Sequence, residues 1–308
     1  MHLKKYTSIG VVLLAISQSA NALIINFDYT YDTSGFFAGA NASRQDILNA
    51  AGSFFSNRIT DSLSAITSGG NNHFDAQFLR PDTGALATLN DFSVAANTLT
   101  VFVGGRDLTG NTLGEGGYGG YSASGTSGFL ATIDQRGQSG EATGPSATDF
   151  APWGGQLAFD TNSIWYFDVD PSTTESFSGS DFYSVALHEI GHLLGLGTAD
   201  SWDNKVSGTN FTGVNAVAAY GGNVPLTTNG SHWQEGTLST TLTGLSQEAM
   251  MDPTITNGTR KLATQLDIAA LKDVGWQVSS VPVPASIWLF GSVLATFVGI
   301  RRKQSVTV

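Results

Sequence analysis

The stretch that decides the fold runs from Val185 to Trp202 and reads "VALHEIGHLLGLGTADSW". Its two histidines, His188 and His192, are four residues apart, and Glu189 directly follows the first of them. On an α-helix, residues four apart lie one above the other on the same face, so both imidazoles can reach one ion. Glycines follow the apolar run and indicate where the helix ends. The stretch therefore predicts a metal-binding helix over about residues 181–195.

The same pattern favours a particular chemistry. Zinc held by such a pair lowers the pKa of a bound water to about 7. Glu189 can then take the water's proton as the water attacks a carbonyl, and pass it to the leaving amine. A short motif of this kind also arises by chance in unrelated proteins. Here its apolar neighbours cover the helix on an otherwise polar chain, so we prefer a zinc site to a helix with two surface histidines.

A zinc site of this type needs a third protein ligand, with one position left for water. In the long version of the motif, that ligand stands ten residues after the first histidine, where this chain has Thr198, a poor zinc ligand. Two replacements are open, His232 in a polar loop and the nearer Asp200. Because neutral imidazole suits zinc, we favour His232. His73 lies far upstream and is expected to be an ordinary polar residue.

The stretches "HEIGHLLGLG", "SHW" and "EAMMDP" together resemble the metzincin clan of zinc metalloproteases. The resemblance implies a twisted N-terminal sheet, the zinc helix and a methionine-containing turn beneath the metal. Met251 matches the turn methionine, with Met250 as the neighbouring alternative, and its role would be packing. The segment Gly154–Trp165 is similar to a matrixin motif. The late position of His232 resembles the arrangement in leishmanolysin, where an insertion precedes the third histidine.

Two further positions bear on the metal content. Ala158 stands where matrixins place a structural-zinc histidine, so the resemblance implies one catalytic zinc and no second one. Asp160 is a candidate calcium ligand, but Asn162 and Ser163 beside it weaken that assignment, and calcium stays unassigned. The chain has no cysteine, which excludes disulfides, thiolate zinc sites and a matrixin-type cysteine latch.

Composition and length set the broad class. The chain has 308 residues, of which 41% are hydrophobic, enough to build a core in one large domain or two modest ones. Charged residues make up only 13%, with 37 glycines and a net charge of −11. No basic stripe is present, so nucleic acid is not an expected partner. The Gly-, Ser-, Thr- and Asn-rich acidic composition is typical of exported bacterial proteins.

Both ends are predicted to be targeting segments. Residues 1–22 combine Lys4 and Lys5, a short apolar run and the small residues Ala20-Asn21-Ala22, which is typical of a secretory signal peptide. Residues 281–303 hold an apolar run followed by a basic tail and resemble the PEP-CTERM sorting signal of Gram-negative bacteria. The resemblance implies processing by an exosortase-type enzyme and transient membrane association. Pro282-Val283-Pro284 lacks the central Glu of that signal, and an ordinary membrane tail is the alternative.

Between these ends, residues 23–278 are expected to form one metalloprotease domain. Strands are predicted at 23–31, 73–79, 98–105 and 151–160, the last extended by 163–169, and helices at 43–63, 181–194 and 264–276. Residues 198–246 are expected to be irregular. This order predicts an α+β fold of the zincin or metzincin kind: a twisted, mostly parallel N-terminal sheet, two long helices, and an irregular C-terminal subdomain that ends in a helix.

The glycine-rich segment 106–146 is expected to be a surface loop. It contains Gly114-x-Gly116-x-x-Gly119, which matches a dinucleotide-binding pattern. Because no helix is predicted after it, and a glycine-rich segment yields such matches by chance, we reject that interpretation.

The sequence thus predicts an exported zinc endopeptidase that acts on a protein or peptide substrate. His188, His192 and His232 would hold the zinc, and Glu189 would be the general base. We expect the protein at the cell surface, in the extracellular matrix or secreted. The alternative is a non-catalytic zincin-like protein of the surface or biofilm matrix, which the composition and the sorting segment fit equally well.

Overall fold

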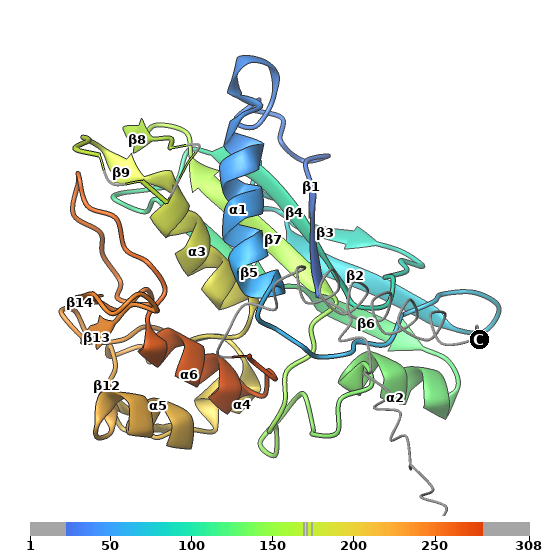
Figure 1. Cartoon of the computed structure of the whole chain (residues 1–308). Coiled ribbons are helices and arrows are strands. Elements are labelled where there is room, and N and C mark those ends of the chain that lie inside the picture. Colours follow the sequence, from blue (N-terminus) through green and yellow to red (C-terminus); the bar gives the residue numbers. More distant parts are fainter. Residues whose placement is uncertain (1–22, 169, 171, 174, 280–308) are drawn as a thin grey trace, which may run out of the picture.

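A four-stranded sheet in the order β1-β4-β7-β5 lies at the centre of the molecule (Figure 1). The strands β1 (Ile24–Asp28), β4 (Thr98–Arg106) and β7 (Gly154–Asp160) are parallel, and β5 (Gly114–Tyr118) runs antiparallel along the outer side of β7. β4 reads "TLTVFVGGR" and is largely buried, as expected of an inner strand covered on both faces. The mostly parallel sheet agrees with the α+β expectation.

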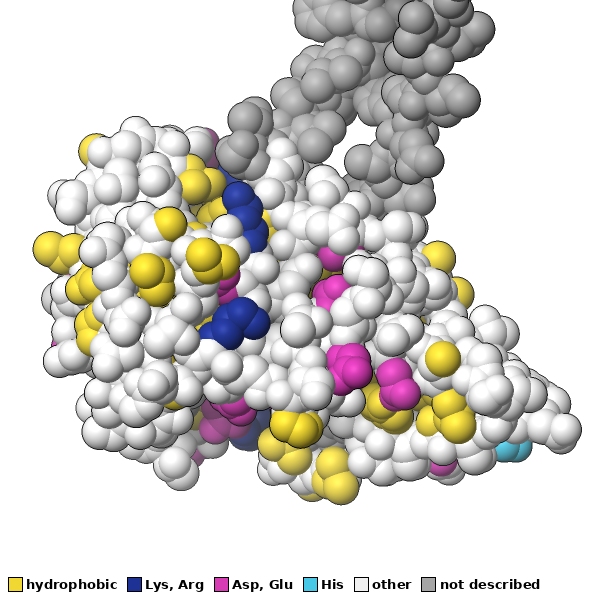
Figure 2. All heavy atoms as spheres, turned by 90° about the horizontal axis from the view of Figure 1, so that it is seen from below, with side chains coloured by type: hydrophobic (Ala, Val, Ile, Leu, Met, Phe, Trp, Pro, Cys, Tyr) yellow, Lys and Arg dark blue, Asp and Glu magenta, His cyan; other side chains and the backbone are white. Residues whose placement is uncertain are grey.

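The structure is a computed structural model that describes residues 23–168, 170, 172–173 and 175–279. The predicted signal peptide and sorting segment lie outside these residues. Within the part of the chain that is described, no helix is long and apolar enough to cross a membrane. Figure 2 shows one face of this part, on which uncharged atoms predominate and the few basic side chains lie among acidic ones.

A second sheet, which is antiparallel, packs against the central sheet. Its order is β3-β2-β6, with β2 (His73–Leu79), β3 (Leu86–Leu89) and β6 (Gly120–Ser124). Phe78 stacks on Phe102 of β4 with ring centroids 4.2 Å apart, and Trp153 joins the same buried cluster. The small sheet is therefore fixed to the central one by an aromatic core of its own.

Two helices cover one face of the central sheet, α1 (Arg44–Ser56) and α3 (Phe182–Leu193) (Figure 1). The expectation for the first helix was wrong at its end, which lies at Ser56 rather than near Leu63. Ile59 and Leu63 are buried as their helical spacing suggested, but Ile59 forms a β-bridge with Val278. The apolar positions thus continue into the core in an extended chain.

The prediction of a loop over residues 106–146 was also wrong. This segment contains β5, β6 and a helix, α2 (Ser127–Gln135), whose N-cap Thr126 accepts a hydrogen bond from Phe129 N at 3.3 Å. The strands escaped notice because their glycines give no alternation of apolar and polar residues. Residues 163–169 do not extend β7 either. They form the short β8 (Trp165–Tyr166), which pairs with β9 (Ser180–Asp181).

The C-terminal part is built from short elements and one regular helix, α6 (Gln265–Val274), close to the predicted position. Thr264 and Asp267 form a capping box at its start. The segment expected to be irregular does contain two short helices, α4 (Asp200–Asp203) and α5 (Val214–Tyr220). Its short strands are β10 (Val206–Ser207), β11 (Asn210–Phe211), β12 (Val224–Pro225), β13 (Leu238–Thr240) and β14 (Ser246–Glu248).

Candidate metal centre

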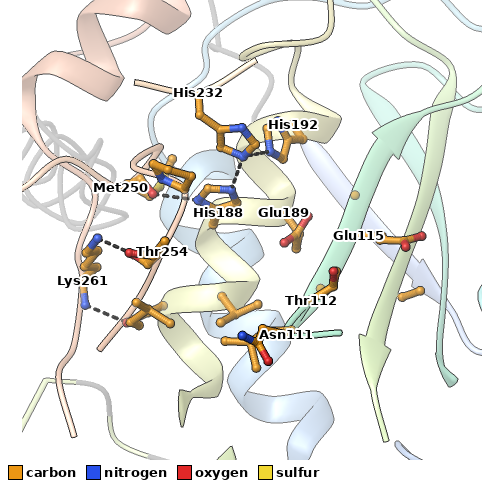
Figure 3. A pocket seen from close by; sticks show the side chains of 18 of the residues that line it. Asn111, Thr112, Glu115, His188, Glu189, His192, His232, Met250, Thr254 and Lys261 are labelled. Atoms are coloured by element: carbon orange, nitrogen blue, oxygen red, sulfur yellow. Dashed lines mark hydrogen bonds between the residues drawn. The ribbon is translucent and has the colours of Figure 1, made fainter. Parts of the chain in front are cut away.

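Helix α3 carries two of the candidate ligands through the middle of the core. It begins where Asp181 accepts a hydrogen bond from Ser184 N at 3.2 Å, and its sides are almost wholly buried. Gly195, with φ of +97°, lets the chain turn away after the helix. This local structure follows the sequence prediction. It places His188 and His192 on the side of α3 that lines the pocket drawn in Figure 3, a cleft described below.

The loop that carries His232 can approach the chain that follows α3 because residue 197 is a glycine. At Gly197, which has φ of +73°, a Cβ atom would lie 1.9 Å from the backbone oxygen of Ser231. No other residue allows that approach. On the other side, Trp233 is fully buried, and its Nε1–H donates to Asp267 at 2.9 Å. The residues on both sides of His232 are therefore fixed, and the imidazole between them points back at the helix.

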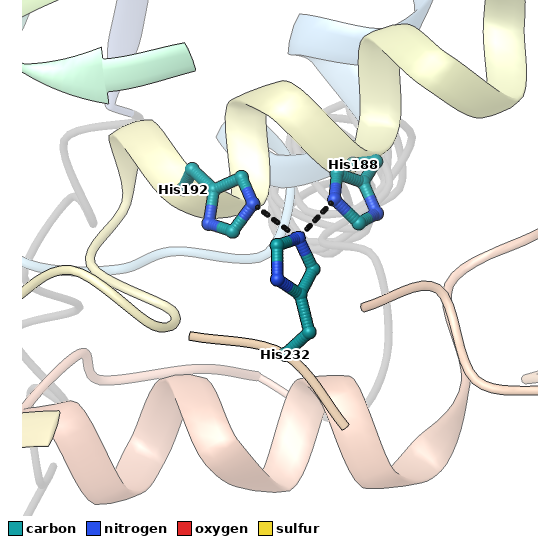
Figure 4. A group of neighbouring side chains, drawn as sticks. All are labelled: His188, His192 and His232. Carbon is teal, nitrogen blue, oxygen red and sulfur yellow. Dashed lines mark hydrogen bonds between the residues drawn. The ribbon is translucent and has the colours of Figure 1, made fainter. Parts of the chain in front are cut away.

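The three imidazoles converge through their Nε2 atoms (Figure 4). His232 Nε2 lies 3.1 Å from that of His188 and 3.0 Å from that of His192. His188 Nδ1 donates to the backbone oxygen of Met250 at 2.8 Å, and His192 Nδ1 donates to that of Leu196 at 2.8 Å. Because a carbonyl oxygen only accepts, both helix histidines carry their proton on Nδ1 and turn an Nε2 lone pair inward.

This donor set fits a divalent cation. A proton on His232 Nε2 could satisfy one inward lone pair well, but not both at once. A cation at the common centre would satisfy all three, and outer hydrogen bonds of this type orient metal-bound histidines. Among the described residues, these three histidines form one of two groups whose ligand atoms could hold a metal ion.

Burial keeps these histidines neutral. Desolvation, helped by the charge of His232, lowers the pKa of His188 to about 3. Desolvation also lowers the pKa of His192 well below its ordinary value, with His188 and His232 adding to the effect, and it lowers the pKa of His232. Neutral imidazole is the form that binds a metal, so the three rings are in the ligand state at neutral pH.

Glu189 is buried beside the histidines and points from α3 toward the side of the cleft where Glu115 lies (Figure 3). Desolvation raises the pKa of its carboxyl to about 8, the charge of Glu115 adds to the rise, and the backbone amide of Gly116 opposes it. A cation on the histidines would act in the opposite direction and favour the carboxylate. A carboxyl with a pKa near neutrality beside a metal position can take up and release a proton.

These groups open into a cleft of about 820 Å³. Its walls come from α3, from β5 with the preceding residues 111–113, and from residues 252–255 after the methionine turn. The size is that of a site for a small ligand or a segment of an extended chain.

Comparisons with known proteins point to the same chemistry. The family model described as Matrixin matches residues 130–205, which contain His188, Glu189 and His192 but not His232. Over 48 residues the chain is 48% identical to "Metalloendoproteinase 1" of Glycine max, a match that covers 16% of each chain. Both matches support a metzincin-type metalloprotease. Matrixins are zinc-dependent, and the three histidines are a group that could hold such an ion.

Both matches cover only part of the chain. The chain covers about 16% of the length of the curated relative that it matches, and no solved structure matches it. The family match ends before the loop of His232. The assignment of His232 as a candidate ligand therefore depends on geometry and chemistry rather than on a relative.

The methionine turn lies beneath α3. A Cβ atom at Gly191 would lie 2.6 Å from Met251 Sδ and 3.0 Å from Met250 Cε, so the glycine is what admits both side chains. Met251 is fully buried, whereas Met250 lines the cleft and its backbone oxygen orients His188. The packing role expected for the turn is thus shared between the two methionines.

Sequence reasoning missed Asp267, which connects the turn to the histidine loop. Its carboxylate accepts from Met250 N at 2.9 Å and Met251 N at 3.2 Å, as well as from Trp233 Nε1. The acid lies at the third position of α6, where it completes the capping box with Thr264. That local signal was readable in the sequence, but the contacts with residues 233, 250 and 251 were not.

The remaining candidates lie away from the centre. Asp200 Oδ2 accepts a hydrogen bond from Gly144 N, and the Thr198 hydroxyl donates to the backbone oxygen of His192 at 2.7 Å. His73 pairs with Asp91 on the surface at 2.6 Å. Asp160 accepts from Leu108 N and Ser163 Oγ, so both carboxylate oxygens have protein donors, which gives no support to a calcium site there.

Proposed function

We propose that the protein is an exported zinc-dependent endopeptidase. The observation that carries the proposal is the convergence of the His188, His192 and His232 Nε2 atoms beside the buried Glu189. These three histidines would hold one zinc ion. When bound, zinc would supply a Lewis acid that lowers the pKa of water and polarises a peptide carbonyl.

The chain's own residues would do the rest. Glu189 would take the proton of the attacking water on its carboxylate and deliver it to the nitrogen of the leaving amine. A cation on the histidines would keep this carboxyl ionised and its burial acts the other way, so the group could accept a proton and release it again. The Met250 and Leu196 carbonyls would keep the two helix imidazoles in the tautomer that ligates metal.

The location is a proposal drawn from the sequence alone. The signal-like residues 1–22 would direct export from a Gram-negative bacterium. Residues 281–303 would hold the protein transiently at the membrane until an exosortase-type enzyme cuts it, leaving it at the cell surface, in the matrix or secreted. The substrate would be an extracellular protein or peptide.

The test is a pair of measurements on the purified protein. Metal analysis should give one zinc per chain, and casein together with a mixed peptide library should be cleaved in a manner that a chelator abolishes and added zinc restores. Glu189→Gln should retain the zinc and lose roughly 10²- to 10⁴-fold in hydrolysis. A protein without zinc would refute the metal site. Stoichiometric zinc with no cleavage of either substrate would favour the non-catalytic surface protein instead.

A further inference from the structure

The glycine-rich strand β5 lies directly against Glu189. A Cβ atom at Gly114 would lie 2.7 Å from Glu189 Oε1, 2.8 Å from its Cγ and 3.0 Å from its Cδ. A Cβ atom at Gly116 would meet the backbone instead, 2.4 Å from the carbonyl oxygen of Glu189. Approaches this close leave no space for a side chain. The strand can therefore pack on this turn of α3 because it is bare at these two positions.

The requirement for glycine comes from the contact and not from the backbone. Neither Gly114 nor Gly116 has a positive φ, so alanine could adopt the conformation of either residue. Gly117, on the opposite face of the same strand, has only the Gln156 amide nearby, at 3.4 Å from its would-be Cβ. Gly119 again faces a close neighbour, at 2.1 Å from Trp153 Cζ2. The three glycines of the pattern that matches a dinucleotide-binding site are thus each explained by a close contact.

We propose that Gly114 is a positioning residue for the carboxylate of Glu189. The inference rests on the function proposed above. Glutamate has three rotatable side-chain bonds, and the bare face of β5 forms a wall against its terminal carboxyl. A methyl group at residue 114 would displace that carboxyl while leaving the backbone of α3 in place, since the atoms that it meets are Oε1, Cγ and Cδ. Gly116 instead sets the distance between strand and helix.

A double-mutant cycle on thermal stability tests the contact without relying on hydrolysis. Gly114→Ala should lower the Tm of the zinc-loaded protein by roughly 2–8 °C. In a Glu189→Ala background most of that loss should vanish, because the three atoms in conflict are gone. Gly116→Ala should cost as much in both backgrounds, since its conflict is with the backbone oxygen. Gly117→Ala should cost little in either. An equal loss from Gly114→Ala in both backgrounds would overturn the proposal.

Kinetics tests the positioning itself. Gly114→Ala should lower kcat on the order of 10²-fold, with KM changed by less than about threefold and the zinc content unchanged. Gly128→Ala, on α2 with open space around it, is the matched control and should keep wild-type kinetics. A kcat that stays within twofold of wild type in Gly114→Ala would overturn the proposal.

The two hypotheses fail in different ways. If the wild-type protein hydrolyses no peptide, the proposed function fails, and the catalytic meaning of Gly114 fails with it, whatever the stability cycle shows. If the wild-type protein is active and the cycle shows no coupling between residues 114 and 189, the positioning inference alone fails.

Discussion

Two groups of ligand-type side chains occur among the described residues, and they differ in what occupies their centre. His188, His192 and His232 turn uncharged nitrogens toward one point. Glu235, Glu248 and Asp252 also lie within reach of one ion, but the ammonium of Lys261 lies 2.7 Å from Asp252 and 2.8 Å from Glu248. The protein supplies its own cation to the acidic group and none to the histidines. Proximity of ligands therefore identifies a metal site only where no side chain neutralises them.

The largest effect is expected from His232→Ala. Loss of one of three ligands should weaken zinc binding by more than about 100-fold, since even the loss of a hydrogen bond to a ligand costs 10- to 100-fold. Chelator-dependent hydrolysis should disappear with the metal. Zinc titration of the metal-free protein, followed by competition with a fluorescent chelator, measures the change.

His73→Ala is the matched control for that experiment. His73 is the other histidine among the described residues, and it lies on the surface beside Asp91. Its removal should leave zinc binding unchanged. If His232→Ala and His73→Ala bind zinc equally well, the contrast between the two groups is lost.

A separate effect, on stability rather than on zinc binding, is expected from Lys261→Met, which removes the internal cation of the acidic group. The side chain of Asp252 is fully buried, so it would be left as an uncompensated charge, at a cost of about 3–5 kcal/mol in the free energy of unfolding. Millimolar calcium should recover part of that stability in the variant and little in the wild type. Urea denaturation with and without calcium measures both. A variant that calcium does not stabilise would show that the acidic group cannot take an external ion.

The sequence alone could identify those site residues whose relation to one another is local. His188 and His192 were found because their relation is local, four residues on one helix. His232 could be suggested from ligand chemistry, but its position depends on Gly197 and Asp267, which act through contacts between distant segments. A pattern of apolar residues cannot report such contacts.

The cleft wall opposite α3 was missed for a different reason. β5 has glycines at three of its five positions, two of which pack bare against α3, so it shows no strand periodicity. The same absence of side chains was mistaken for the sign of a surface loop. The end of α1 was missed because Ile59 and Leu63 stay buried after the helix stops, and burial alone does not distinguish a helix from an extended chain.

The smallest expected effect is a pH-dependent difference in stability between the wild type and Glu189→Gln. In the metal-free protein the pKa of Glu189 is raised from 4.5 to about 8, mainly by burial. The folded state then holds a proton that the unfolded state releases, so this group's contribution is fully present below pH 4.5 and is lost as pH rises through about 8. Glu189→Gln removes that loss. The metal-free variant should gain about 3 kcal/mol on wild type as the pH rises from 5 to 7, at about 1.4 kcal/mol per pH unit.

The histidines act in the opposite direction and cancel in this difference. Their pKa values are lowered, so their contribution is lost as pH falls below about 6.5, equally in wild type and variant. Urea denaturation in chelator at several pH values gives the difference directly. Zinc should flatten it, because a cation on the histidines favours the Glu189 carboxylate. If the difference in unfolding free energy between wild type and variant stays constant with pH, or if zinc leaves it unchanged, the Glu189 carboxyl is not coupled electrostatically to the histidine centre.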